Sequence, residues 1–440
     1  MTTSLLVGVS ILAIIILTSK LKLKAFVALF LVSLFLAFTT LPASTIVNTL
    51  KEGFGNTMAS IGFLIILGAM IGITLDKTGA TLSIARYILS KTGEKRSARA
   101  LGITGFITGI PIFCDSAFII LSGLAKSFSA KSKTAMPFMA TVLASSLYSI
   151  HCLIPPHPGA LAAAGMFNVN IGYLIVVGIL FAIPGALSAY LWSKWLTGKG
   201  NYPPASEPEV DININQEKLP SPFLSFLPVV VPLLLITLRS LVILFDKGGQ
   251  LLITRLFAIP GEPIFALSIG VVLSLLLLKG KTMDNVNSIF TEAIEKAGPI
   301  LIVTAAGGMF GMVIKATGTG EAMGKMLAGT NLGLMVPFLI AVVMKTAQGS
   351  STVAIITTAS FVSPMLPMLG LDAEAGKLLA MLSMGAGSML VSHANDSYFW
   401  VVSNFAGIDS TVNLKIYSSS TIVMGIVIFA CIWTTSLFIL

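Results

Sequence analysis

Long apolar runs constrain this chain more than any other feature. Segments of roughly 17–25 mostly apolar residues, the length that an α-helix needs to cross a bilayer, recur in both halves of the sequence. Hydrophobic residues make up 55% of the 440 and charged residues only 10%, which is more apolar surface than a water-soluble core needs. We therefore expect an all-α integral membrane protein whose apolar helices face the lipid bilayer.

The charged residues anchor these helices. The net charge of +9 lies in short loops between apolar runs, which fits the excess of Lys and Arg in cytoplasmic loops and not a nucleic-acid partner. The apolar start precedes its lysines and lacks an Ala-x-Ala-like cleavage site, so we expect a retained first helix and not a signal peptide. The three cysteines show neither a disulfide pattern nor metal-ligand spacing.

The segment 100–125 has an unusual charge pattern. Asp115 is its one acidic residue, Pro111 lies near its middle, and basic connectors flank it on both sides. If both connectors are cytoplasmic, the segment enters the membrane and returns as a re-entrant hairpin with Asp115 at its tip. The alternative is one long tilted helix with an incidental aspartate. We prefer the hairpin, because intramembrane carboxylates usually mark an ion or substrate path.

An internal repeat extends this pattern to the second half. GAMIGITLDKTG at 68–79 aligns with GGMFGMVIKATG at 307–318, with five of twelve positions identical at an offset of 239. Ser146 and His151 match Ser388 and His393 at an offset of 242. A second hairpin is then expected near 333–364. Five crossings per half, an odd number, would invert the second repeat, and the broken helices of such folds meet at a site near the membrane midplane.

These patterns define the expected organisation. The first repeat spans 1–197, a polar cytoplasmic linker 198–221, and the second repeat 222–440. The helices that we expect, apart from the two hairpins, are 3–18, 25–40, 56–75, 134–152, 171–193, 222–242, 263–278, 298–315, 376–400 and 417–438. An amphipathic, basic connector is expected at 76–99.

Polar residues gather in a few islands within the apolar runs. Hydroxyl, amide and backbone N–H donors at helix ends suit a small polyhydroxylated carboxylate. Prolines at 155, 156 and 158 disfavour a regular helix there and free backbone groups for binding. The candidate substrate-binding residues are Asp115, Ser116, His151, Pro155, Pro156, His157, Gln348, Gly349, Ser350, Ser351, Thr352, His393, Asn395 and Asp396.

Three of these residues are candidates for ion coupling. Moving an anion inward against a negative-inside potential is opposed by about 2.3 kcal/mol per charge per 100 mV, so a cation should accompany it. Asp115 and Asp396 could bind Na⁺ or take up a proton, and His393 titrates near neutral pH. The residues themselves leave H⁺ and Na⁺ both open.

Five segments, in order along the chain, resemble the gluconate permease family of sugar-acid:proton symporters. They are GFGNTMASIGFLIILGAMIG (53–72), TGEKRSARALGITGFITGIPIFCD (92–115), LIPPHPGALAAAG (153–165), AQGSSTVA (347–354) and SHANDSYFW (392–400). The resemblance implies an inner-membrane symporter with a scaffold domain, a mobile transport domain that moves like an elevator, and a homodimeric assembly. It also implies proton coupling and no cofactor.

The sequence departs from the family pattern where substrate is expected to bind. The first hairpin reads PIFCDSAF, with Cys114 and Ser116, where the family often has PLFFDVGF. Gluconate, glycerate and D-serine therefore all stay open as substrates, as does a Na⁺-coupled carrier.

The alternatives from other classes of protein are an intramembrane enzyme and a passive channel. An intramembrane enzyme is disfavoured because there is no His-Glu-x-x-His motif and the first two histidines have poor helical metal spacing. A passive channel is the third alternative, and saturable, accumulating uptake would exclude it.

Overall fold

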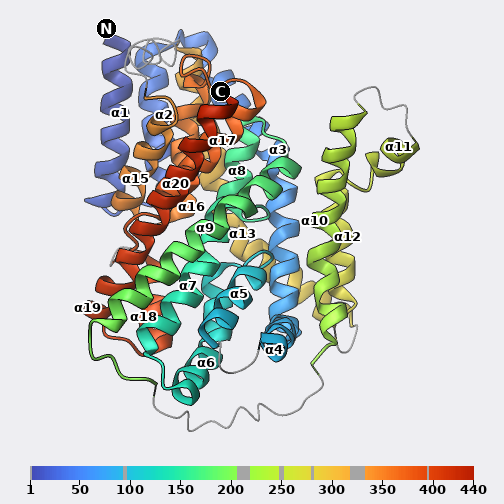
Figure 1. Ribbon diagram of the computed structural model, residues 1–440. Helices are drawn as coiled ribbons and strands as arrows, with labels where there is room; N and C mark the ends of the chain where they lie inside the picture. Colours follow the sequence, from blue (N-terminus) through green and yellow to red (C-terminus); the bar gives the residue numbers. More distant parts are fainter. Residues whose placement is uncertain are drawn as a thin grey trace.

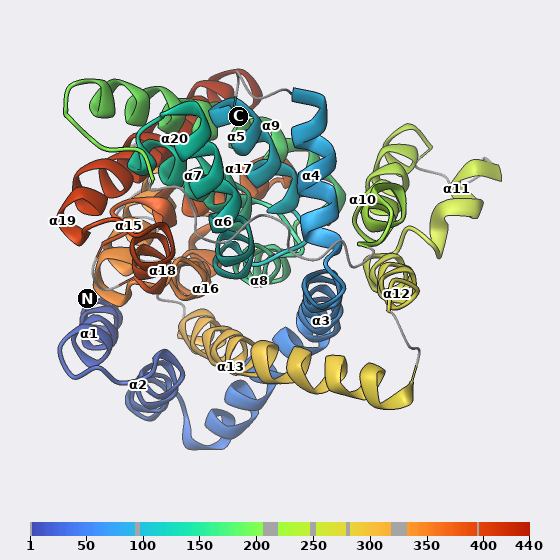
Figure 2. The ribbon, with the colours of Figure 1, turned by 90° about the horizontal axis from the view of Figure 1, so that it is seen from below.

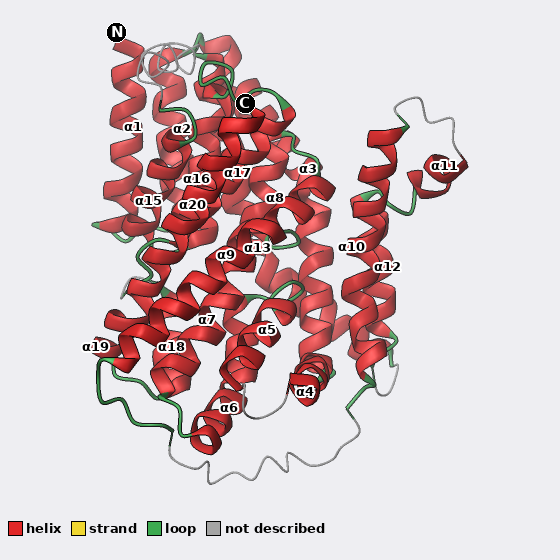
Figure 3. Ribbon diagram, in the orientation of Figure 1, coloured by secondary structure: helices red, strands yellow, loops and turns green. Residues whose placement is uncertain are grey.

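The computed structural model describes residues 2–92, 97–205, 219–246, 252–278, 282–317, 332–393 and 396–440. The regular structure in this part of the chain is entirely helical (Figure 3). The first half contains α1 (Thr2–Ser19), α2 (Ala25–Thr40), α3 (Ala43–Lys77), α4 (Ala80–Thr92), α5 (Ser97–Thr108), α6 (Cys114–Ser132), α7 (Met136–Leu153), α8 (Pro158–Phe167) and α9 (Ile171–Gly198).

The second half contains a similar series. Its elements are α10 (Pro222–Phe245), α11 (Leu252–Ala258), α12 (Pro263–Leu275), α13 (Met283–Ala316), α15 (Met335–Gln348), α16 (Ser351–Val362), the 3₁₀ turn η2 (Ser363–Met365), α17 (Glu374–Met389), α18 (Ser397–Ala406), α19 (Ser410–Asn413), the π-helical turn η3 (Leu414–Ser418) and α20 (Ser419–Ile439).

Three helix predictions need correction. The helix expected at 298–315 begins at Met283, and the one expected at 56–75 begins at Ala43, because both continue through polar, exposed turns that an apolar window misses. The single helix expected at 376–400 is two helices, α17 and α18. The proline-rich segment does contain a helix, since Pro158 occupies the first turn of α8, where its missing N–H costs nothing.

Length and composition qualify five described helices as membrane spans, or six if the bent α3 is one span. They include α9, α10 and α13, and a span that joins α7 to α8. The ten crossings expected from charge counting therefore stay a prediction. Shorter apolar helices such as α2 and α12 fall below the length criterion.

The core of the molecule is built around α7 and α17. Every residue of α7 is buried, so this apolar helix is surrounded by protein on all sides. It packs on α5, α6, α9 and α17. Figure 2 shows α1, α2, α13, α3, α12 and α10 placed along two sides of this central group, and Figure 1 shows α10 to α12 at its outer edge.

Two helix pairs are broken within the central group. Residues 109–113 separate α5 from α6, at the place where the first hairpin was expected to break. Residues 349–350 separate α15 from α16, inside the second expected hairpin. Gly349 has φ +85°, a conformation that glycine adopts without a Cβ penalty. The breaks are observed, whereas entry and return across one membrane face stay predictions.

Glycines of the two long helices approach the central group closely, α3 at the first break and α13 at α16. A Cβ added at Gly72 would lie 3.0 Å from the carbonyl oxygen of Pro111, in the first break. A Cβ at Gly311 would lie 3.0 Å from the carbonyl oxygen of Ser360 in α16. Small residues thus bring backbones together without side-chain packing between them.

Gly387 tests this close packing. Its added Cβ would lie 2.3 Å from the carbonyl oxygen of Phe338, so Gly387→Ala should push α15 and α17 apart and destabilise the fold by about 1–3 kcal/mol. Gly123 in α6 has nothing within 4 Å of its added Cβ. Gly123→Ala is the matched control and should be neutral or slightly stabilising. Thermal unfolding of both variants in detergent tests this prediction. Equal melting temperatures for the two variants would contradict the close packing at Gly387.

Candidate functional site

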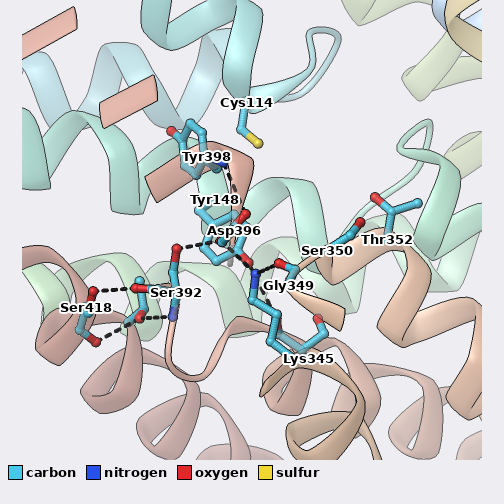
Figure 4. A network of polar contacts seen from close by, with 12 residues as sticks. Cys114, Tyr148, Lys345, Gly349, Ser350, Thr352, Ser392, Asp396, Tyr398 and Ser418 are labelled. Carbon is cyan, nitrogen blue, oxygen red and sulfur yellow. Dashed lines mark hydrogen bonds and ion pairs between the residues drawn. The ribbon is translucent and has the colours of Figure 1, made fainter. Parts of the chain in front are cut away.

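A buried ion pair lies between the second break and the start of α18. Lys345 Nζ is 2.6 Å from Asp396 Oδ2, and the two side chains are 0% and 5% exposed (Figure 4). The other ion pairs found in the described residues are all partly exposed. Removing two charges from water is costly, so a pair this deep needs further hydrogen bonds to persist.

The ends of two helices supply those further bonds. Lys345 stands in the last turn of α15 and also donates to the carbonyl oxygen of Gly349. Asp396 is the N-cap of α18, and its Oδ1 accepts from the N–H of Tyr398 at 3.1 Å. Cations are favoured at helix C-termini and anions at N-termini, so the two helix dipoles stabilise the pair.

The carboxylate has one more donor, and the ammonium faces a ring. Ser392 Oγ donates to Asp396 Oδ2 at 2.5 Å. Ser418 in turn donates to the carbonyl oxygen of Ser392, which fixes this segment against η3. Lys345 Nζ lies 5.6 Å from the ring centroid of Tyr148 on α7, within cation–π range.

A second polar chain joins the two breaks. His157 Nε2 lies 2.7 Å from the carbonyl oxygen of Gly109, His151 Nδ1 lies 3.2 Å from His157 Nδ1, and His151 Nε2 lies 3.3 Å from Thr352 Oγ1. A carbonyl oxygen can only accept, so neutral His157 must carry its proton on Nε2. His151 then donates from Nδ1 to His157, and Thr352 donates to His151. The chain therefore runs in one direction, from α16 to the end of α5.

The first break presents Asp115 in the first turn of α6. Asp115 and Ser116 are partly exposed, and Cys114 Sγ donates to Asp115 Oδ2 at 3.7 Å. The charges of Asp396 and Lys345 act on Asp115, so both carboxylates belong to one electrostatic cluster. Pro155 and Pro156, joined by a cis peptide bond, follow α7 beside this break, with Pro156 packed against Gly68.

The second break collects the remaining predicted residues. Ser350 caps α16 by accepting from the N–H of Val353 at 3.3 Å. Ser351 is buried and Thr352 half-buried in the first turn of α16. Gln348 ends α15, and its Oε1 is buried with no hydrogen-bond partner among the described residues.

The structure thus places most of the predicted residues at the two breaks and on the neighbouring segments. His393 lies beside the ion pair, and its carbonyl oxygen accepts from the N–H of Asp396 at 2.8 Å. Asn395 lies outside the described residues. The prediction missed Lys345. The signal was present, because Lys345 is the one charged residue between Lys325 and Asp372, and a lone intramembrane charge indicates a functional site.

Helix boundaries also revise the internal alignment. The ten-residue helices α8 and α18 begin at Pro158 and Ser397, an offset of 239 that equals the offset of the glycine match. This offset pairs His157 with Asp396, and each is the N-cap of its helix. Each also contacts the break of its own half, through Gly109 and Lys345 respectively.

Apolar spanning helices around a buried polar cluster at two helix breaks define a multi-pass membrane transporter. The GntP family permease profile matches residues 2–438, and the chain belongs to this family. It is 32% identical to the inner membrane permease YgbN of Escherichia coli K12, over 96% of each chain. It is 30% identical to the low-affinity gluconate transporter of that strain, over 95% of this chain and 94% of that one, and 30% identical to its L-idonate transporter, over 91% of each.

Solved structures share the fold at much lower identity. The Alcanivorax borkumensis YdaH transporter matches with a TM-score of 0.62 and 14% identity, over 94% of this chain and 97% of that one. Neisseria gonorrhoeae MtrF matches with a TM-score of 0.64 and 16% identity, over 90% and 86%. The family and its named members are permeases and transporters, so this chain is a permease and not an enzyme.

The ion pair generates a stability prediction. Lys345→Met leaves a buried carboxylate unpaired and should lower the free energy of unfolding by about 3–5 kcal/mol. The double variant Lys345→Met/Asp396→Asn removes both charges and keeps an N-cap acceptor, so it should recover much of that loss. SDS-induced unfolding in mixed micelles measures both. A double variant that loses the sum of the two single losses would contradict the pairing.

Proposed function

We propose that this protein is a secondary active transporter that imports small hydroxylated carboxylates such as gluconate, together with H⁺, across the inner membrane of a bacterium. The observation that best supports the proposal is the buried Lys345–Asp396 pair at the second break. It places a cation suited to a substrate carboxylate beside a group that can take up a proton. Relatives named as gluconate and L-idonate transporters, at 30% identity, support the substrate class.

An unpartnered polar atom fits a hydroxylated substrate. Gln348 Oε1 is buried without a hydrogen-bond partner among the described residues. Buried polar groups rarely stay unpaired, because the loss of water is then uncompensated. A substrate hydroxyl group would supply a donor to Gln348. The shorter carboxylate glycerate, and D-serine, stay as alternative substrates.

The arrangement of helices supports an elevator-like movement. In the proposal, the central group with both breaks is the transport domain, and the helices along its two sides form a scaffold (Figure 2). Glycines of α3 and α13 face the central group at backbone distance, as a smooth contact between moving parts requires. Breaks that enter from opposite membrane faces, and a homodimer held by the scaffold, complete the proposed transporter.

The need for a coupled cation follows from the negative charge of the substrate. An anion that enters alone against a negative-inside potential is opposed by about 2.3 kcal/mol per 100 mV, and a proton carried with it cancels this cost. The cluster contains carboxylates and imidazoles, and both kinds of group can carry a proton. A Na⁺-coupled carboxylate carrier is the alternative.

Uptake by purified protein in proteoliposomes tests the proposal. An inward proton gradient without Na⁺ should drive accumulation of radiolabelled gluconate above the external level, and a protonophore should abolish it. Unlabelled idonate, glycerate, D-serine and citrate compete in parallel and rank the size of the binding site. Empty liposomes are the control.

Two results would count against it. If accumulation needs Na⁺ and is lost when choline replaces Na⁺, the coupling ion is Na⁺ and not H⁺. Equilibration without accumulation in either gradient would point to a passive channel.

A further inference from the structure

We propose that Lys345 binds the carboxylate of the substrate, and that Asp396 must take up a proton before Lys345 can do so. The inference deepens the proposed function and rests on it. Asp396 Oδ2 is paired with the ammonium of Lys345 at 2.6 Å. A substrate carboxylate and the Asp396 carboxylate therefore compete for one buried cation.

The replacement of Asp396 by the substrate carboxylate as the partner of Lys345 is balanced in charge and in atoms. Before binding, the site contains one ammonium and one carboxylate and is neutral. The substrate carboxylate then pairs with Lys345, the ion pair to Asp396 opens, and one proton adds to an Asp396 carboxylate oxygen. After binding, the site contains an ammonium, a substrate carboxylate and a neutral carboxylic acid, and is again neutral. One monoanion thus enters with one proton.

Because the ion pair is buried, substrate binding and proton uptake must occur together. If the substrate carboxylate paired with Lys345 without proton uptake, Asp396 would remain a buried, unpaired charge, which costs several kcal/mol. If Asp396 took up a proton without substrate binding, Lys345 would be the unpaired charge. Both intermediate states are disfavoured, so substrate and proton bind together. Uncoupled leakage of either one is suppressed by the same penalty.

The surroundings of Lys345 leave room for this role. An ammonium has three N–H donors, and those of Lys345 have two oxygen partners in the described structure, Asp396 and Gly349. Gln348 shares the last turn of α15 with Lys345, and its Oε1 has no hydrogen-bond partner among the described residues. A carboxylate on Lys345 would bring the adjacent substrate hydroxyls to the second break.

Access to the pair requires movement. Neither side chain is more than 5% exposed, so this structure is closed at Lys345. The second break is a place where backbone can rearrange, since residues 349–350 lie between α15 and α16 and Gly349 has φ +85°. Opening at this break would expose the pair to one side of the membrane.

Other titratable groups lie around the pair, and two of them, Asp115 and His151, could take up a proton in place of Asp396. Charges of the pair act on Asp115 and Cys114 in α6, on Tyr148, His151 and Cys152 in α7, on Tyr398 in α18 and on Tyr417 in η3. The neutral thiols and phenols already carry their protons. Among the described residues, Asp396 is the anion that contacts Lys345 directly. A test must therefore identify the group as well as the number of protons.

Titration calorimetry in detergent supplies that test. Gluconate is titrated into the purified protein in two buffers of different ionisation enthalpy, and the difference in heat gives the protons taken up. For the wild type we expect about one proton per gluconate, since linked proton uptake follows from the exchange. Asp396→Asn keeps the cap but has no charge to neutralise, so it should bind gluconate with no proton uptake.

Lys345 is tested in the same experiment. Lys345→Gln should weaken gluconate binding by about tenfold or more, because a charge-assisted hydrogen bond is lost. Lys345→Arg should restore part of the binding. Lys77→Gln is the matched control, since Lys77 pairs with Glu292 at 2.8 Å but both side chains are about one-third exposed. Its affinity should equal that of the wild type.

A milder variant guards against misfolding of Asp396→Asn. Ser392→Ala removes one hydrogen bond to the charged Asp396 carboxylate and leaves the ion pair in place. The charged state of the site is then less stabilised relative to the state that binds substrate, so gluconate binding should persist to higher pH than in the wild type. Size-exclusion chromatography confirms that each variant is folded.

The outcomes separate this inference from the proposed function. Proton uptake that persists in Asp396→Asn, or an unchanged pH profile in Ser392→Ala, overturns the exchange and leaves the transporter proposal intact. If the protein binds glycerate or idonate but not gluconate, the proposed substrate changes. The proton uptake measured with that ligand then tests whether Asp396 is protonated on binding. Binding of none of these carboxylates overturns both.

Discussion

The structure depends on a charge pair that is buried in the protein interior. Lys345 and Asp396 would each be costly alone in this interior, so the two helix ends that carry them must stay together. The cation stands at the C-terminal end of α15 and the anion at the N-terminal end of α18, where helix dipoles favour them. The same pair therefore fixes the second break, the start of α18 and the neutrality of the site.

Helix breaks supply the polarity that an apolar bundle otherwise lacks. At each break, backbone groups leave the helical ladder and must find partners inside the protein. The carbonyl oxygen of Gly109 finds His157, and that of Gly349 finds Lys345. The chain from Thr352 through His151 to His157 joins the two breaks. The breaks thus form one connected polar centre around the buried helix α7.

The sequence predicted many elements of this centre and missed others for identifiable reasons. Asp115 and the first break were found because a lone carboxylate and a proline interrupt an apolar run between basic connectors. Lys345 is equally isolated in the sequence, but the Gln-Gly-Ser-Ser-Thr cluster beside it is a stronger local indication of a polar site. The break between α17 and α18 was missed because residues 376–400 read as one apolar run with a polar end.

The sequence by itself determined the class of structure, because apolar length, sparse charge and recurring glycines admit little besides a bundle of membrane helices. It also located both helix breaks, since proline, glycine and hydroxyl residues disrupt a helix locally. Only the tertiary structure decided which polar residues meet. Lys345 and Asp396 are 51 residues apart and His151 and Thr352 are 201 apart. Local patterns carry no record of such pairings, because they arise when whole helices pack against one another.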